Sequence, residues 1–224
     1  MTNLVKIDRA LMGLIVVTLI ATLGVYFWDK EYFSLTFAAE DKLVEYGTAV
    51  FLLISSFVLI KNAASLSAKK RLFAAGLTLF YAFLFFMAAG EEISWGQRIF
   101  GWESNEFFEA NNKQFETNLH NMIIPTPFGD MHLAKTLFGS VLTTVILLYL
   151  AVLPFLYKRF EKIRNLANRL VVPVPDMRHT FFAILASLII ASIDVSRKWE
   201  VYELIFSLLT TSIFLLPQNR DKVT

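Results

Sequence analysis

The chain of 224 residues has no cysteine and few charged residues. Without cysteine it cannot form a disulfide, bind a metal through a thiolate or attack a substrate with a thiol, so any metal site must use histidine and carboxylate side chains. Charged residues make up 18% of the chain and apolar residues 56%, whereas a soluble domain averages about 25% charged residues. This composition indicates a polytopic membrane protein.

Charged residues are also absent from the middles of the hydrophobic runs, which cover residues 10–28, 43–60, 72–90, 136–157, 180–194 and 201–216. A hydrocarbon core about 30 Å thick needs about 20 helical residues, so the first four runs predict full spans and the last two are short. We expect a single all-α transmembrane bundle over residues 1–224 with about six spans. Residues 91–135 would form a long outer loop that contains a short helix on the membrane surface.

Basic residues gather near the N-terminus and in residues 61–71, 158–169 and 220–222. The positive-inside rule makes these connections and both termini cytoplasmic and places the loop 91–135 on the outer side. We expect a bacterial inner membrane location and contact between the basic connections and membrane lipid. No groove-reading module accompanies these basic residues, so we expect no nucleic acid partner.

Acidic side chains converge on the outer ends of the predicted spans, and several are spaced so that they share one helix face. Crowded carboxylates repel one another and are tolerated when a cation or a basic group lies among them. We therefore predict that these acids bind a cation or a substrate: Asp41, Glu45, Asp194, Glu200 and Glu203.

A second cluster begins where the third run ends, in the segment Gly90–Gly101. If the helix continues through it, Glu91, Trp95 and Arg98 lie on one face. The outer loop that follows holds two of the three histidines of the chain, His120 and His132.

Histidine and carboxylate side chains are suitable ligands for zinc or another divalent ion. We predict metal ligation by Glu92, His120 and His132, although the spacing contains no His-Glu-x-x-His pattern and the fold must bring the three together. Histidines that only form hydrogen bonds are the alternative.

The segment Gly90–Gly101 with Glu116–Asn121 resembles uncharacterised bacterial multi-spanning membrane proteins with a GEEISWGQR-type motif, a resemblance that implies no activity. A second resemblance is to the CAAX-type glutamic intramembrane proteases, which combine a Glu-Glu-x-x-x-Arg motif with later histidines. Here Arg98 comes two residues late and the histidines lack the usual spacing, so this resemblance does not extend to the protease activity.

These patterns favour an outward-facing membrane enzyme, a metal-assisted hydrolase or transferase that acts on a lipid or a membrane-proximal substrate. Glu91 would act as acid or base, and Arg98 would bind an anionic substrate group. Two alternatives stay open. A non-catalytic scaffold would bind a protein partner or form a homo-oligomer, whereas a cation-coupled carrier is disfavoured because the middles of the spans offer only Ser, Thr, Tyr and Gly.

Overall fold

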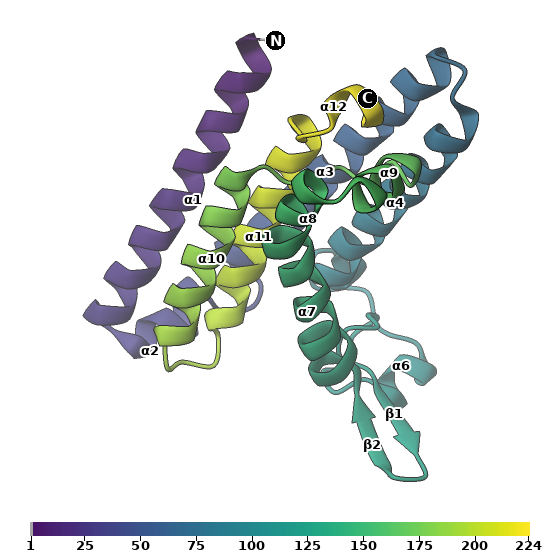
Figure 1. Ribbon diagram of the computed structural model, residues 1–224. Helices are drawn as coiled ribbons and strands as arrows, with labels where there is room; N and C mark the ends of the chain where they lie inside the picture. The colour runs from purple at the N-terminus through teal and green to yellow at the C-terminus, as the bar shows by residue number, and fades with distance from the viewer. Residues whose placement is uncertain (1) are drawn as a thin grey trace.

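The computed structural model describes residues 2–224, and 76% of the chain is helical. Long helices stand side by side, a small β-hairpin projects from one end, and both termini lie at the opposite end (Figure 1). The expectation of a mostly helical bundle is therefore confirmed.

Six hydrophobic helices match the six hydrophobic runs. They are α1 (Thr2–Trp28), α3 (Leu43–Ala68), α4 (Leu72–Glu92), the continuous helix formed by η3 (Ala134–Val141), α7 (Leu142–Leu147), η4 (Leu148–Val152) and α8 (Leu153–Arg159), and finally α10 (Met177–Ser192) and α11 (Lys198–Leu215). Four are long and apolar enough to cross a membrane, namely α1, α3, α4 and the helix over residues 134–159. These helices are consistent with an integral membrane protein.

Helix boundaries agree with the apolar runs at some ends and extend beyond them at others. Helix α3 begins at Leu43 as predicted, but it ends at Ala68 rather than at residue 60, and α1 begins well before residue 10. Polar residues such as Lys61 and Asn62 do not break the backbone hydrogen bonds of a helix, so hydropathy marks the apolar part of a helix and not its full length.

Short elements connect the long helices: α2 (Lys30–Tyr32), η1 (Phe33–Phe37), η2 (Ser94–Gly96), α5 (Gln97–Phe100), α6 (Glu106–Asn111), β1 (Ile123–Thr126), β2 (Gly129–His132), α9 (Glu161–Arg169) and α12 (Arg220–Val223). Strands β1 and β2 are antiparallel, with Ile123 opposite His132 and Thr126 opposite Gly129. Sequence analysis predicted no strands in this loop.

Helix α11 lies at the centre of the bundle and packs against α1, α3 and α10. A Cβ atom added at Gly47 of α3 would lie 3.0 Å from Leu204, so the two helices approach closely there. The Oγ atom of Ser55 on α3 lies 2.8 Å from Oγ1 of Thr211 on α11. In a membrane, lipid is as apolar as the protein core, so burying apolar side chains does little to hold helices together. Close packing of small side chains and hydrogen bonds between helices then stabilise the bundle.

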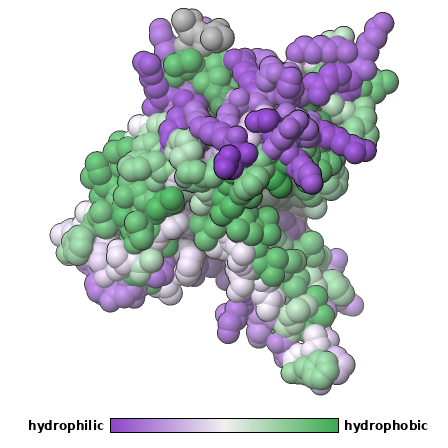
Figure 2. Space-filling view, viewed as in Figure 1, coloured by the Kyte–Doolittle hydropathy of each residue, from purple (hydrophilic) through white to green (hydrophobic). Residues whose placement is uncertain are grey.

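The surface shows an apolar band between two hydrophilic ends (Figure 2). Large apolar side chains in this band are more than half exposed, among them Phe57, Phe83 and Leu188. We call the end of the bundle that holds Glu45, Glu92 and Glu203 the acidic end, and the end where both termini lie the basic end.

Candidate functional site

The predicted motif forms a tight turn at the acidic end of α4 rather than a continuing helix. Helix α4 ends at Glu92, and Ser94, Trp95 and Gly96 have φ angles of 47°, 56° and 79°. A Cβ atom at Gly90 would lie 2.7 Å from the Trp95 ring, so the turn needs glycine there. The prediction that Glu91, Trp95 and Arg98 share one continuous helix face is therefore wrong.

Glu91 holds the turn and the outer loop together. Its carboxylate accepts hydrogen bonds from Trp95 Nε1 at 3.0 Å, from the backbone N–H of Leu119 at 2.5 Å and from the backbone N–H of His120 at 3.3 Å. The carboxylate of Glu91, which was predicted to act as acid or base, is thus engaged by three donors of the turn and the loop.

Arg98 and Arg197 neutralise a group of acids that we call the paired acids: Glu40, Asp41 and Glu116. Arg98 Nη1 lies 2.5 Å from Asp41 and 3.6 Å from Glu40, and Nη2 contacts Glu116. Arg197 Nη1 lies 2.6 Å from Glu40. The guanidinium of Arg98, predicted to bind an anionic substrate group, is therefore already surrounded by carboxylates of this chain.

Glu40 shows the electrostatic effect of this pairing. Burial alone would raise the pKa of Glu40, but the hydrogen bonds from Arg197 and Gln114, together with the nearby arginine charges, hold it below its ordinary value. The same interactions with Glu40 raise the pKa of Arg197. Each charge therefore stabilises the ionised form of the other.

Glu116 is the most deeply buried of the paired acids. It accepts hydrogen bonds from Ser94 Oγ at 2.8 Å and from Asn118 Nδ2 at 2.7 Å, in addition to its contact with Arg98. Its side chain is only 7% exposed. The arginine and these donors therefore offset the free-energy cost of burying a charged carboxylate.

A second group of acids lies beside the paired acids, and we call it the carboxylate cluster: Glu92 at the end of α4, with Glu200 and Glu203 in the first turns of α11. One carboxylate oxygen from each residue lies within 4.8 Å of the other two, and all three side chains are partly buried. Glu200 contacts Arg197 at 3.4 Å. Within residues 2–224, Glu92 and Glu203 have neither a hydrogen bond nor an ion pair through their side chains.

Glu45 on α3 adds a fourth carboxyl group near this cluster. Glu45 itself accepts a hydrogen bond from the backbone N–H of Asp41. Carboxylates this close cannot all be ionised without a compensating positive charge, so the cluster must hold protons or a cation. Carboxylate oxygens are the ligands that Mg²⁺, Ca²⁺ and Mn²⁺ prefer.

The structure does not bring the predicted metal ligands together. His132 is exposed at the end of β2, and the ring of His120 lies against the ring of Phe138, with 5.1 Å between the ring centres. Burial lowers the pKa of His120. In the described part of the chain, Glu92 meets the acids of α11 instead of these histidines, because loop contacts and not sequence spacing decide where each side chain lies.

The acids predicted to bind a cation or a substrate do not all lie at one place. Glu200 and Glu203 belong to the carboxylate cluster, whereas Asp41 is paired with Arg98. Asp194 lies at an exposed site, where its carboxylate accepts hydrogen bonds from Lys30 Nζ at 2.8 Å and from the Tyr26 hydroxyl at 2.6 Å. Asp194 is thus partnered elsewhere at the acidic end.

Sequence analysis did not assign roles to the residues that separate these two groups. Glu40, Glu116 and Arg197 decide which carboxylates are neutralised. Glu116 begins the segment that carries the family resemblance, so a signal was present, but spacing alone cannot show that it contacts Arg98.

The chain matches no protein-family model, and no curated protein or solved structure matches it.

Proposed function

We propose that this protein binds a divalent cation through Glu92, Glu200 and Glu203 at the acidic end of its bundle, and that it uses the cation in hydrolase or transferase chemistry on a lipid or membrane-proximal substrate. One observation carries the proposal. Glu92 and Glu203 lack partners within residues 2–224 although a third carboxylate lies within 4.8 Å, while the neighbouring acids are neutralised by arginines.

The arrangement of basic groups supports a cation rather than a further salt bridge. Arg98 contacts the paired acids, and Arg197 contacts Glu40 and Glu200, so the two arginines leave the charges of Glu92 and Glu203 uncompensated. A divalent ion supplies the missing charge and fills the space between three converging oxygen ligands.

A cation held by three carboxylates keeps coordination positions for water or for a substrate oxygen. It would lower the pKa of a bound water and stabilise negative charge that develops on the substrate. Glu45 lies close enough for its charge to act on Glu92 and Glu203, and it is the candidate proton acceptor. Exposed aromatic side chains in the outer loop, Phe100 and Phe107, offer an apolar surface for a lipid substrate.

The membrane arrangement belongs to the same proposal. Helices α10 and α11 complete a bundle of about six spans. The loop over residues 91–135, with α6 at the membrane surface, would lie on the outer side of a bacterial inner membrane and both termini would be cytoplasmic. The common position of the termini at the basic end supports this arrangement (Figure 1).

The test is titration of the detergent-purified full chain with Mn²⁺, Mg²⁺, Ca²⁺ and Zn²⁺, using calorimetry and, for Mn²⁺, electron paramagnetic resonance. We expect one saturable site that prefers the oxygen-seeking ions and that loses at least about 100-fold in affinity in Glu92→Gln and in Glu203→Gln.

Two controls make the titration specific. Glu106→Gln removes an exposed acid of the same loop and should leave the affinity unchanged. The double variant His120→Ala/His132→Ala should also bind normally. Binding that depends on the histidines, or a wild-type chain without saturable binding, would overturn the carboxylate site.

A second candidate function, a cation-coupled carrier, is favoured by one observation. Below Glu203 on α11, the side chains of Ser207, Thr210, Thr211 and Ser212 are all buried. Ser212 Oγ lies 2.5 Å from Asp8, and Asp8 is 1% exposed near the basic end of α1. The buried carboxyl group of Asp8 thus supplies the ionisable group that the Ser and Thr side chains of the spans do not provide, and a carrier path requires such a group.

Flux through proteoliposomes distinguishes the two functions. A carrier should move cations or protons at a rate that falls in Glu203→Gln and in Thr211→Val, whereas an enzyme should bind the cation without flux. Thr78→Val, which removes a buried hydroxyl of α4, is the matched control.

A further inference from the structure

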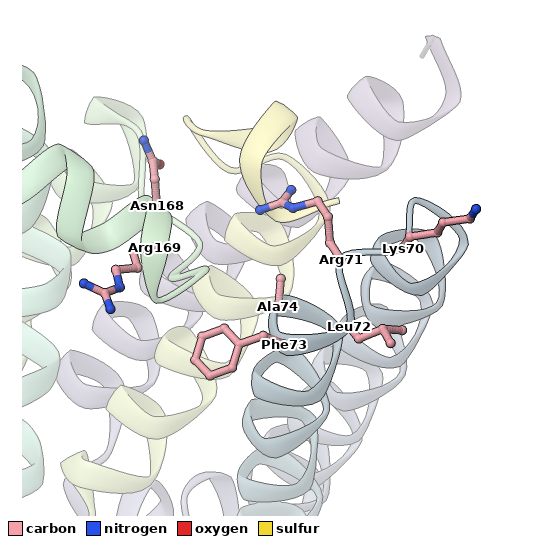
Figure 3. A pocket seen from close by; sticks show the side chains of 7 residues that line it. All are labelled: Lys70, Arg71, Leu72, Phe73, Ala74, Asn168 and Arg169. Carbon is pink, nitrogen blue, oxygen red and sulfur yellow. The ribbon is translucent and has the colours of Figure 1, made fainter.

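The basic residues at the basic end are too distant to neutralise the carboxylate cluster. Helix α4 has 21 residues, which places its first residue roughly 30 Å from Glu92 in its last turn. A hollow of about 400 Å³ opens beside the start of α4, and Lys70 and Arg169 extend away from it in opposite directions (Figure 3). Arg71, at the same hollow, donates a hydrogen bond to the carbonyl of Lys222 at 2.8 Å. Any positive charge that the chain itself offers to the cluster must therefore come from the acidic end.

At the acidic end, most basic side chains are engaged away from the cluster. Lys30 pairs with Asp194 at 2.8 Å, and Arg98 contacts the paired acids. Lys198 Nζ donates a hydrogen bond to a backbone carbonyl at 2.6 Å. Within residues 2–224, Arg197 is the one basic residue that forms an ion pair with a member of the cluster.

Arg197 is shared between the paired acids and the carboxylate cluster. Its Nη1 atom lies 2.6 Å from Oε1 of Glu40, a paired acid, and 3.4 Å from Oε1 of Glu200, a member of the cluster. Nη1 carries two hydrogens, so one nitrogen can serve both acids at once. The contact with Glu40 is the short one, and the contact with Glu200 is longer than an ordinary N–H···O hydrogen bond. The guanidinium is therefore held by Glu40 and only leans on Glu200.

A divalent ion in the cluster would compete with Arg197 for Glu200. The ion needs an oxygen of Glu200 as a ligand, and it places two positive charges a few ångströms from a guanidinium, so the two repel. Glu40 lets Arg197 yield without losing its partner. Gln114 of the outer loop fixes the position of Glu40, because its Nε2 atom donates to the same Oε1 atom at 3.0 Å.

We propose that Arg197 is an internal competitor of the cation: it shares Glu200 while the cluster holds no divalent ion, and it turns entirely to Glu40 when the ion binds. This inference rests on the proposed function, since it concerns the affinity of the same site. Arg197 then sets the cation concentration at which the site fills. Glu40 decides how strongly Arg197 competes, because it is the alternative partner.

The test is titration of the full chain in detergent with Mn²⁺, followed by electron paramagnetic resonance. Arg197→Gln should bind Mn²⁺ at least about fivefold more tightly than the wild type, because a competing ion pair is removed from a ligand. Glu40→Gln should bind it at least about fivefold more weakly, since Arg197 then has Glu200 as its remaining strong partner. An Arg197 that only stabilised the fold would not weaken cation binding. Circular dichroism and the unfolding midpoint verify that each variant is folded.

A double variant separates competition from the general effect of nearby charge. Glu40→Gln/Arg197→Gln should bind Mn²⁺ within about twofold of Arg197→Gln alone, because Glu40 acts through Arg197. Two charges that acted independently would give effects that add, and that result would overturn the proposal.

Lys198→Gln is the matched control, because it removes the same charge one residue further along α11, from a side chain that bonds to a backbone carbonyl. Its Mn²⁺ affinity should stay within about twofold of the wild type. A gain equal to that of Arg197→Gln would mean that any positive charge at the start of α11 weakens binding, and would also overturn the proposal.

The same titration distinguishes failure of this inference from failure of the cation site. Saturable binding by the wild type, with Arg197→Gln unchanged or weaker, would leave the site in place and overturn only the role of Arg197. Absence of saturable binding in both the wild type and Arg197→Gln would remove the site and the competition together. Binding that appears only in Arg197→Gln would support the competition, with Arg197 as the stronger occupant.

Discussion

The paired acids and the carboxylate cluster lie at the same end of the molecule but differ in their partners. Glu40, Asp41 and Glu116 face arginines, and their negative charge is compensated by the chain itself. Glu92 and Glu203 face other carboxylates, with an arginine near only Glu200. Acids of one motif therefore include both structural residues and functional candidates, and their contacts distinguish the two.

Neighbouring residues of the motif show this division most clearly. Glu91 accepts three hydrogen bonds from the turn and the loop, whereas the side chain of Glu92 forms none within the described chain. Two adjacent glutamates on the last turn of a helix point in different directions, so one organises the loop and the other meets α11.

The largest expected loss of stability follows from removing the arginine that neutralises the paired acids. Arg98→Ala leaves Glu116 buried without its cation and exposes Asp41 to the nearby negative charge. We expect a loss of about 3 kcal/mol in the free energy of unfolding, at the low end for a buried pair because Arg98 is partly exposed. Denaturant unfolding of the purified chain measures it.

Lys113→Ala, an exposed cation in the same loop, is the control and should change stability little. If both alanine variants unfold alike, the arginine pairing is not what stabilises this end.

The second effect concerns the carboxylate cluster. At a cation concentration of about 100 times Kd, the wild-type chain should gain about 2.7 kcal/mol in the free energy of unfolding. Glu92→Gln and Glu203→Gln should lose this gain. In the presence of a chelator the same variants should be as stable as the wild type or more so, because each removes one repelling charge. Thermal unfolding with and without the cation provides the measurement.

A wild type that gains no stability from any divalent ion would contradict the assignment. So would a chelator-treated Glu92→Gln chain that is clearly less stable than the wild type, since that would mean that Glu92 has a stabilising partner.

A smaller effect is expected from Glu91→Ala. Loss of this acceptor leaves the N–H groups of Leu119 and His120 unpaired, and because the loop is partly exposed the cost should be about 1 kcal/mol. Hydrogen exchange at these two amides should speed up, while cation affinity stays as in the wild type. A loss of cation affinity with unchanged exchange would reverse the roles given to Glu91 and Glu92.

The smallest effect is the pH dependence from Glu40. Its pKa is lowered in the folded chain, so its contribution is complete above the ordinary value of 4.5 and is lost as the pH falls through the folded pKa below that value. Glu40→Gln should be less sensitive to acid over this range when unfolding midpoints are compared. Equal acid sensitivity of the two chains would show that Glu40 is not stabilised by Arg197.

The long helices are predictable from the sequence because their signal is local. Helix α3 begins at Leu43 and α4 at Leu72, where apolar runs follow Lys42 and Arg71. Long apolar runs without charge are helical in a membrane, since each backbone group must be paired within its own segment.

The candidate site was predicted only in part, because its geometry depends on distant contacts. Glu92 was predicted to bind a metal and Glu200 and Glu203 to bind a cation or substrate, and the structure brings their carboxylate oxygens within 4.8 Å of one another although they come from two segments more than a hundred residues apart in the chain. The turn after α4 was missed because Ser94 and Trp95 adopt φ angles that such residues rarely take. The spacing of His120 and His132 carried no information on their positions.

Composition and hydropathy by themselves predicted a mostly helical chain whose long apolar helices can cross a membrane. Only the tertiary structure decided that Arg98 and Arg197 neutralise one set of acids and that Glu92 and Glu203 meet without a partner within residues 2–224. The physical reason is the sequence distance over which each interaction acts. Helix formation and the preference for lipid depend on neighbouring residues, whereas charge compensation depends on which helices pack together.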